Sequence, residues 1–264
     1  MKWDIRAEEA VAGVPFFVRG RVRKRAEEEA ANSGSPVVRL QHVQACRKKF
    51  LENMESEVKG YSLETCFGAG GCPNRAVDSV ALVERIEGLL GKKDLKTFLK
   101  QRVRGPLKIH HEFRIAVADC PNACSRPQIV DLGLIGAQMV EVRGEEDCTR
   151  CGACVEACRE GALALPAGAM SPVHAPEQCL HCGQCLPVCP SETLRGAKRG
   201  FRVLVGGKLG RHPQLGMDLG AVYSIEETLL LVERSLDCYL RHNREGERFG
   251  EILKRIGCGE LTLK

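Results

Sequence analysis

The sequence has no long apolar run and few aromatic residues. None of its uninterrupted apolar segments approaches the roughly 18 residues that a membrane-spanning helix needs, and its first ten residues are mixed and charged. We therefore expect no membrane span, no secretory signal and a cytoplasmic location. Aromatic residues make up only 5% of the chain. Since no nucleic-acid-reading motif occurs either, the net charge of +5 does not predict a nucleic-acid partner.

Disulfide bonds are not expected, although the chain contains 15 cysteines. The count is odd and most of the cysteines stand in tight groups. Both features argue against a disulfide framework and for metal binding in a reducing compartment. Iron–sulfur clusters would use many thiolates at once, and exposed clusters favour an anaerobic organism.

Eight cysteines form two runs with C-x2-C-x2-C-x3-C spacing, the second followed by Pro190. This is the spacing of bacterial two-cluster ferredoxins, in which the fourth cysteine of each run binds the other cluster. Zinc is disfavoured because zinc sites usually close with two cysteine pairs. The predicted ligand sets are Cys148, Cys151, Cys154 and Cys189 for one 4Fe–4S cluster, and Cys158, Cys179, Cys182 and Cys185 for the other.

Four further cysteines follow two predicted strands. Residues 113–118 alternate apolar side chains with a period of two and lead into Cys120 and Cys124. An earlier strand, 61–65, leads into Cys66 and Cys72, which are separated by several glycines that let the backbone turn tightly. Because neither pair completes a metal site alone, the two turns together predict a third 4Fe–4S cluster. Of the other three cysteines, Cys238 and Cys258 are predicted to be structural thiols, and Cys46 is predicted to be a buried or surface thiol.

The stretches HHEFRIAVADCPNAC (110–124) and RVLVGGKLGRHPQLG (202–216) resemble the siroheme-type nitrite and sulfite reductase family. The resemblance covers residues 59–143 and 195–264, with residues 144–194 as an inserted two-cluster ferredoxin domain. It implies an α+β reductase domain that binds siroheme beside its cluster. It also implies that Cys124 is the shared ligand, which bridges the cluster to the siroheme iron.

The resemblance further implies a small oxyanion substrate such as sulfite or nitrite. Family members carry two lysines that flank the phenylalanine before the second cysteine pair, whereas this chain has Glu112 and Arg114 there. Arg114 and Lys208 are the predicted catalytic residues, as cations that would bind the oxyanion. Further basic candidates are Arg75, Lys108, His110, His111, Arg211 and His212.

Residues 1–58 are predicted to form a helical domain. Asp4 can cap a first helix, Pro15 suits the start of a second, and residues 41–58 read as a third. The run VPFFVRGRVRKRAEEEA resembles the small helical domain that ends the B subunit of dark-operative protochlorophyllide reductase. The resemblance implies a domain that covers a tetrapyrrole.

Later helices are predicted over residues 74–91, 94–104 and 247–257, and a long one follows Ser224, which forms a capping box with Glu227. The predicted fold class is α+β, with the helical segment first, the reductase-like domain next and the ferredoxin domain inserted into it. Residues 144–194 carry two basic residues against seven acidic ones, and the remainder carries 37 against 27. A basic body suits anionic clusters, siroheme carboxylates and an oxyanion.

Three functions remain open at this point. The first is a siroheme and iron–sulfur reductase that takes electrons from a donor protein through its own ferredoxin clusters. The second is an electron-transfer subunit of a larger redox complex, without siroheme catalysis. The third is a tetrapyrrole-binding protein that acts on another substrate. Because the resemblance covers a single half of the family's usual pair of halves, we expect a homodimer or a complex with another subunit.

Overall fold

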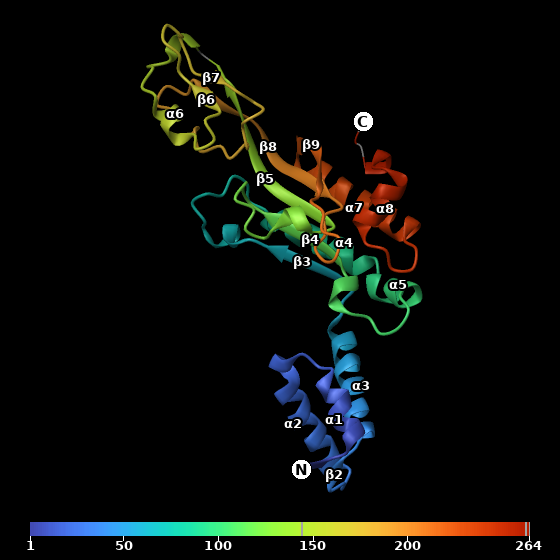
Figure 1. Cartoon of the computed structure of the whole chain (residues 1–264). Helices are drawn as coiled ribbons and strands as arrows, with labels where there is room; N and C mark the ends of the chain where they lie inside the picture. The colour runs from blue at the N-terminus through green and yellow to red at the C-terminus, as the bar shows by residue number, and fades with distance from the viewer. Residues whose placement is uncertain (144, 262, 264) are drawn as a thin grey trace. The chain divides into compact units, whose positions relative to one another are not determined.

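The computed structural model describes residues 1–143, 145–261 and 263, with the side chains of 17, 51–54 and 145 outside that description. Gly144, Thr262 and Lys264, which fall within the predicted domains, lie outside the described residues. The chain divides into two compact units, one of residues 1–59 and 103–110 and one of residues 60–102 and 111–264 (Figure 1).

The first unit is helical. Its elements are β1 (Lys2–Trp3), α1 (Ile5–Ala12), α2 (Phe16–Asn32), β2 (Val37–Val38) and α3 (Leu40–Glu57), and the two short strands pair in parallel. As predicted, the Asp4 side chain caps α1, accepting a hydrogen bond from the Arg6 backbone N–H at 3.4 Å. Small side chains fill the core, so the helices pack closely. The core consists of Ala7, Val11, Ala26, Ala30, Val38 and Val43.

The second unit is built on a five-stranded mixed sheet. Its strands are β3 (Tyr61–Thr65), β4 (Phe113–Ala118), β5 (Leu132–Val142), β8 (Leu194–Val205) and β9 (Met217–Tyr223), paired in that order. The first three run parallel to one another, and β8 and β9 are antiparallel to their neighbours. The predicted strand at 113–118 is observed, and the α+β fold class is confirmed.

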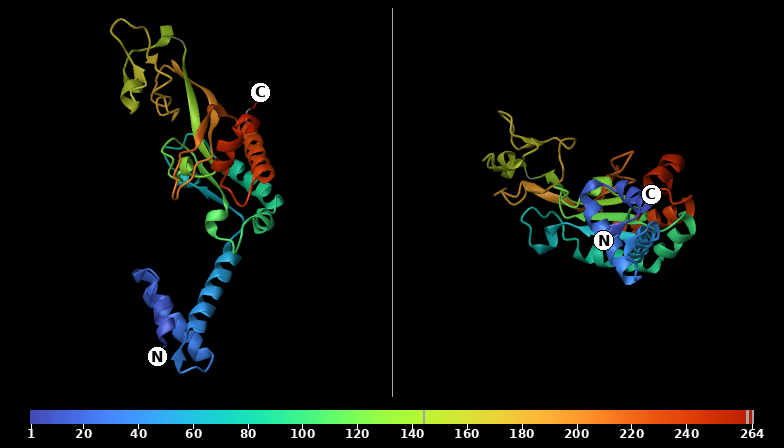
Figure 2. Two further views of the ribbon diagram at one scale, coloured as in Figure 1. Left: turned by 45° about the vertical axis from the view of Figure 1, so that its right-hand side comes forward. Right: turned by 60° about the horizontal axis from the view of Figure 1, so that its bottom comes forward.

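Four helices gather on one side of this sheet (Figure 2). They are α4 (Val80–Lys92), α5 (Leu95–Arg102), α7 (Ile225–His242) and α8 (Phe249–Ile256). The ring of Phe113 from β4 packs on Tyr239 from α7 and Phe249 from α8, with centroids 4.9 and 5.5 Å apart. The predicted capping box of α7 is present, because Ser224 and Glu227 each accept the other's backbone N–H.

Helix α4 begins later than predicted. Residues 74–79 were expected to be helical, but the helix starts at Val80. The backbone N–H groups of Ala76 and Val77 donate instead to the Asp119 carbonyl, at 2.9 and 3.1 Å, and Arg199 Nε donates to the Ala76 carbonyl at 2.7 Å. These long-range bonds replace helical ones and hold the segment against the turn after β4.

The predicted ferredoxin segment lies between β5 and β8, which form a long antiparallel hairpin (Figure 1). The segment contains α6 (Ala153–Ala157), β6 (Leu163–Ala164) and β7 (Val173–His174). The Gln138 backbone N–H of β5 donates to the His181 carbonyl at 2.7 Å, which fixes the segment to the hairpin. In the part of the chain that the structure describes, no helix combines the length and apolar character needed to cross a membrane.

Candidate iron–sulfur centres

The parallel pairing of β3 and β4 brings two cysteine-bearing turns to one edge of the sheet. Thr65 stands opposite Val117, and the Cys66 backbone N–H donates to the Val117 carbonyl at 3.0 Å. Both strands end at this edge, so both turns leave the sheet side by side. We call it the cysteine edge, defined by Cys66, Cys72, Cys120 and Cys124.

Backbone amides point at a sulfur of this edge. The Gly68 N–H donates to Cys66 Sγ at 3.3 Å, and the Asp119 N–H donates to the same sulfur at 3.2 Å. Hydrogen bonds of this kind stabilise a thiolate and tune iron–sulfur clusters. The geometry therefore fits a cluster ligand better than an ordinary buried thiol.

The four sulfurs at the cysteine edge act on one another electrostatically. Burial raises the pKa of the Cys120 thiol, and negative charge on Cys66, Cys124 and Cys72 raises it further, against a hydrogen bond from the Asn122 backbone that lowers it. Thiolates so placed repel one another unless a cation lies among them. Iron supplies that positive charge, so the donor set fits a 4Fe–4S cluster.

The cysteine edge is open on one side. Cys120 is buried at 7% exposure, whereas Cys124 is exposed. Phe67 belongs to the 3-10 helix η1 (Phe67–Gly70) that follows Cys66, and it is 90% exposed. Cys124 is therefore the sulfur of this edge with room to contact a further group.

Asp119 is a buried acid within the cysteine edge. It is 1% exposed, and its Oδ2 has no hydrogen-bond partner among the described residues. Burial raises the pKa of its carboxyl group, and a hydrogen bond with Ser79 opposes that shift. A Cβ at Gly68 would lie 2.1 Å from Oδ2, and one at Gly136 would lie 2.4 Å from the Asp119 carbonyl oxygen. Because Gly68 and Gly136 have no Cβ, they leave room for Asp119.

The ferredoxin segment groups its cysteines across the two runs. The pKa of Cys154 is raised by burial and by the charges of Cys189 and Cys151. Cys148 lines the same small cavity as these three. Cys189, from the second run, therefore lies with the first three cysteines of the first run, as the ferredoxin pattern predicts.

The second group combines three cysteines of the second run with the last cysteine of the first run. Burial raises the pKa of Cys185 to about 12, and the charges of Cys182, Cys179 and Cys158 add to the shift. Backbone N–H groups of Ala162 and His181 donate to Cys158 and Cys179 Sγ at 3.3 and 3.4 Å. A neutral thiol with so high a pKa ionises when iron replaces its proton.

A cavity of about 410 Å³ joins this second group to the cysteine edge. Its lining includes Cys158 and Cys185 from the segment and Cys120 from the turn after β4. Asn74 and Asn122 also line it. Cysteines of both predicted cluster sites therefore line the same cavity.

The predicted catalytic residue Arg114 lies toward the other edge of the sheet. Arg114 is the second residue of β4, which is six residues long, whereas Cys120 lies two positions after the end of that strand. The two edges are therefore roughly 20 Å apart. Arg114 Nε is buried without a hydrogen-bond partner among the described residues. Glu112, two residues before Arg114, is also buried and accepts a hydrogen bond from the Gly60 N–H at 3.3 Å. Its carboxylate therefore helps to hold the start of β3 beside the start of β4.

The predicted catalytic residue Lys208 is held in an ion pair. Its Nζ lies 2.6 Å from Glu251 Oε1 of α8, and its side chain is 9% exposed. Lys208 follows the end of β8, where Val205 pairs with Leu132 at the start of β5. The substrate-binding role of Arg114 and Lys208 stays a prediction, and neither stands at the end of the sheet where the cysteine turns begin.

Charged groups beside Lys208 complete what we call the ion-pair edge, defined by Asp131, Arg248, Lys208 and Glu251. Asp131 is 1% exposed, and Arg248 donates to it at 2.6 Å through one terminal nitrogen and at 3.2 Å through Nε. The backbone N–H groups of Arg114 and Phe249 also donate to Asp131. These contacts satisfy both carboxylate oxygens of Asp131.

Sequence reasoning missed two cations near the cysteine edge. Arg126 stands two residues after Cys124 with its side chain 73% exposed, 3.9 Å from Glu64. Arg199 of β8 reaches the Ala76 carbonyl. Nearness in sequence to Cys124 could have identified Arg126, whereas Arg199 depends on the β5–β8 register. Of the other basic candidates, Arg75 pairs with Asp78 at 3.2 Å, and Arg211 and His212 are exposed. His111 belongs to the second unit, whereas Lys108 and His110 belong to the first.

Comparisons with known proteins match both parts of the chain. Residues 60–263 match the family model described as Nitrite and sulphite reductase 4Fe-4S domain, and residues 3–47 match that described as Proto-chlorophyllide reductase 57 kD subunit. The "Coenzyme F420-dependent sulfite reductase" of Methanocaldococcus jannaschii is 32% identical over 198 residues, which is 74% of this chain and 29% of that protein. An anaerobic sulfite reductase subunit of Salmonella typhimurium is 25% identical over 167 residues, which is 56% of this chain and 44% of that protein.

The chain thus spans less than half the length of these two relatives. Among solved structures, "Crystal structure of dissimilatory sulfite reductase I (DsrI)" shares the fold with a TM-score of 0.50 at 18% identity, covering 81% of this chain and 56% of that one. Both resemblances that the sequence predicted are confirmed. Since one family model covers most of its length, the chain belongs to the nitrite and sulphite reductase 4Fe-4S domain family.

Proposed function

We propose that this protein is an iron–sulfur oxidoreductase of the siroheme sulfite and nitrite reductase type. In this proposal residues 1–58 are a helical tetrapyrrole-covering domain, 59–143 and 195–264 the siroheme domain, and 144–194 a two-cluster ferredoxin domain. The ligands of the three 4Fe–4S clusters are the two interleaved ferredoxin sets and the four cysteines of the cysteine edge.

One observation carries the proposal. Cys66 and Cys120 are 54 positions apart in the sequence, yet parallel pairing of β3 and β4 starts their turns at the same sheet edge. The family to which the chain belongs is described by a 4Fe-4S domain over the same residues. Four converging thiols with amides aimed at one sulfur are what such a cluster needs.

Siroheme would be held through Cys124. Cys124 is exposed while Cys120 is buried, so Cys124 would have access to a second metal outside the cluster. When bound, the clusters would deliver single electrons, and siroheme would supply the site at which a small oxyanion is reduced. Phe67, which follows Cys66 in the chain, is exposed and offers an apolar surface.

Cations at the cysteine edge would bind anions there. Arg126 is largely exposed, and its guanidinium can form paired hydrogen bonds with an oxyanion or a siroheme carboxylate. Arg75 lies close enough to Asp119 to lower the pKa of that carboxyl group. Arg114 and Lys208 remain the sequence-based candidates for contacting sulfite or nitrite.

Asp119 would supply protons. Reduction of an oxyanion removes oxygen as water and so consumes protons, which a buried acid can donate. Burial raises the pKa of Asp119, which favours a proton on its unpartnered Oδ2. The ferredoxin segment, with its excess of acidic residues, would accept electrons from a donor protein with a basic surface.

Another chain would cover the exposed part of the cysteine edge. Cys124 and Phe67 are both exposed, and a tetrapyrrole held there needs walls on both faces. The proposed occupant is a second copy of this chain or another subunit of a redox complex. A monodisperse monomer with siroheme bound would contradict this part of the proposal.

A second candidate is an electron-transfer subunit without its own siroheme catalysis. The arrangement of Arg114 and Lys208 favours it, because Lys208 is held by Glu251 and both residues lie toward the edge opposite the cysteine turns. Under this alternative the three clusters are bound but the exposed Cys124 meets a cofactor of a partner.

The visible spectrum and iron content of anaerobically purified protein test the proposal. Three clusters predict about 12 irons, and siroheme adds a tetrapyrrole band. Assays driven by reduced methyl viologen, with sulfite and with nitrite, then separate an enzyme from a carrier. The reductase proposal requires both the band and turnover, whereas the carrier alternative requires the iron alone. Iron content far below three clusters contradicts both.

A further inference from the structure

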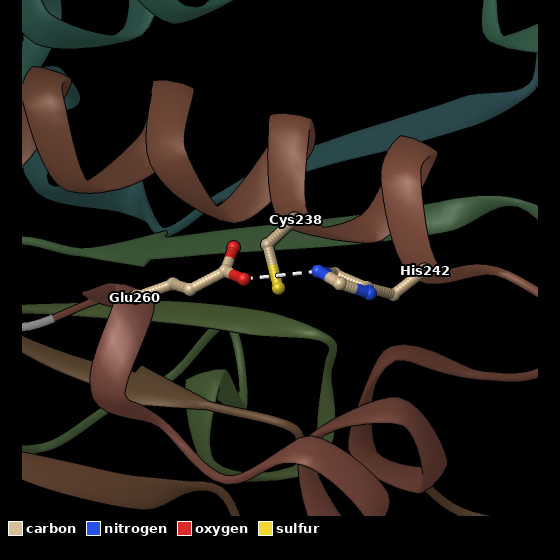
Figure 3. A group of neighbouring side chains, drawn as sticks. All are labelled: Cys238, His242 and Glu260. Carbon is tan, nitrogen blue, oxygen red and sulfur yellow. Dashed lines mark hydrogen bonds and ion pairs between the residues drawn. The ribbon is translucent and has the colours of Figure 1, made fainter.

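Three unlike metal-binding side chains converge near the end of α7, outside the twelve proposed cluster ligands. A sulfur of Cys238, a ring nitrogen of His242 and a carboxylate oxygen of Glu260 all lie within 4.8 Å of one another (Figure 3). Cys238 and His242 are four residues apart on α7, so they share one helix face. Glu260 comes from the 3-10 helix η5 (Gly259–Leu261). Two separate elements therefore supply the group.

The three side chains already contact one another. His242 Nε2 lies 2.9 Å from Glu260 Oε1, and Arg241 donates to Glu260 Oε2 at 3.2 Å. The Cys238 thiol is also hydrogen-bonded to Glu260. Arg241 thus holds the carboxylate by one oxygen and leaves the other facing His242, which is how an outer partner orients a metal-binding carboxylate.

The charge balance of the group favours a divalent cation. Cys238 is 1% exposed, and burial raises the pKa of its thiol to about 11, with the negative charge of Glu260 adding to the shift. Without a cation the sulfur keeps its proton. A cation bound to the thiolate in place of the proton would leave the buried sulfur without an uncompensated charge.

We propose that Cys238, His242 and Glu260 bind a zinc ion. One sulfur, one imidazole nitrogen and one carboxylate oxygen form a borderline donor set that suits zinc and excludes calcium and magnesium, which prefer oxygen ligands only. Water completes the tetrahedron on the side where Glu260 is exposed. Binding forms a zinc–sulfur bond and releases the Cys238 proton to solvent, with no change of oxidation state.

Such an ion would cross-link η5 to the end of α7. The neighbouring Leu261 is buried, so η5 is already packed, and zinc would add a cross-link between two elements about 20 residues apart. The inference is independent of the function proposed above, because it uses none of the proposed cluster ligands.

Zinc retention by the cluster-loaded protein tests the proposal. Protein purified anaerobically is exposed to zinc sulfate and desalted, and its zinc and iron are then counted. We expect about one zinc per chain, and background zinc in C238S, H242Q and E260Q with iron unchanged. C46S and E233Q are the matched controls, since Cys46 lies on α3 and the exposed Glu233 on α7. Both controls should retain zinc.

The ligand set is checked by zinc-edge X-ray absorption, which does not detect iron. We expect one sulfur at about 2.3 Å and nitrogen or oxygen at about 2.0–2.1 Å. An all-sulfur shell would mean that zinc occupies a cluster site, and it would overturn the proposal. Absence of zinc from the parent protein, or equal zinc in E260Q and the parent, would overturn it as well. Glu260 is exposed and outside the buried core, so E260Q removes a proposed ligand without altering a core side chain.

Discussion

The two edges of the central sheet differ in how their polar groups are satisfied. At the ion-pair edge, Asp131 accepts hydrogen bonds on both oxygens and Lys208 is paired with Glu251, although Arg114 Nε toward the same end has no partner among the described residues. At the cysteine edge, Asp119 Oδ2 is buried without a partner among the described residues, and Cys124 is exposed. A closed network stabilises a fold, whereas unpaired and exposed groups in the same domain mark a place for ligands.

The comparison also bears on the residues that the sequence predicts to bind the substrate. Basic residues near the family motif were predicted to bind the substrate, and Arg114 and Lys208 were the first choices. In the structure Lys208 is paired with Glu251, and the Arg114 backbone N–H donates to Asp131. Their substrate-binding role stays a prediction, because charge type alone does not reveal partners that are distant in sequence.

The largest effect on folding is expected from D131N. The substitution removes the buried carboxylate charge that Arg248 and two backbone N–H groups contact, which costs about 3 kcal/mol of unfolding free energy. Anaerobic urea denaturation measures the loss. D237N is the matched control, because Asp237 forms a more exposed pair with Lys93 and should cost less than about 1 kcal/mol. Equal losses for both variants would contradict a structural role specific to the ion-pair edge.

C120S is expected to remove one cluster and spare the others. Iron should fall from about 12 to about 8 per chain, because Cys120 is proposed to bind only the cluster at the cysteine edge. Iron analysis with electron paramagnetic resonance of the reduced protein follows the loss. Should the ferredoxin signals disappear together with the third cluster, the sites would not be separable.

A moderate and pH-dependent effect is expected from K208M. The methionine keeps the buried stem but removes the ion pair, at a cost of about 1 kcal/mol near neutral pH. Hydrogen bonding from Lys208 lowers the pKa of Glu251 below its ordinary 4.5. The stabilisation is therefore complete above pH 4.5 and lost as pH falls through the lowered pKa. Urea denaturation of both proteins across this range should show the difference shrinking, and a difference that is constant with pH would refute the ion-pair role.

The smallest effect on stability is expected from R126Q. Its side chain is mostly exposed, so the unfolding free energy should change by less than about 0.5 kcal/mol. The KM for the oxyanion should rise about tenfold, the cost of one charge-assisted contact. R25Q, an exposed change on α2, is the control for lost charge. Unaltered KM in R126Q would remove Arg126 from the proposed anion site.

The grouping of the ferredoxin cysteines could be predicted because their spacing is characteristic. Three ligands of each predicted cluster stand within one run, and the pattern assigns the fourth to the other run. The cysteine edge was predictable in outline from two strand-then-turn patterns, but its geometry depends on the register that sets Thr65 opposite Val117. Local patterns also placed the capping box of Ser224 correctly.

What the sequence could not supply came from contacts between distant segments. The start of α4 was misplaced because Ala76 and Val77 bond to Asp119, more than 40 residues later. The closeness of Cys238 to Glu260 was not predicted, because Glu260 lies on another element. In both cases the deciding partner carries no signal in the local pattern.

The most direct test of the central claim compares C124S with C182S by visible spectroscopy under anaerobic conditions. If Cys124 joins the cluster of the cysteine edge to siroheme, C124S perturbs the tetrapyrrole band, whereas C182S leaves the band and slows electron delivery from the donor. Equal loss of the band in both variants, or no change in C124S, would contradict the account.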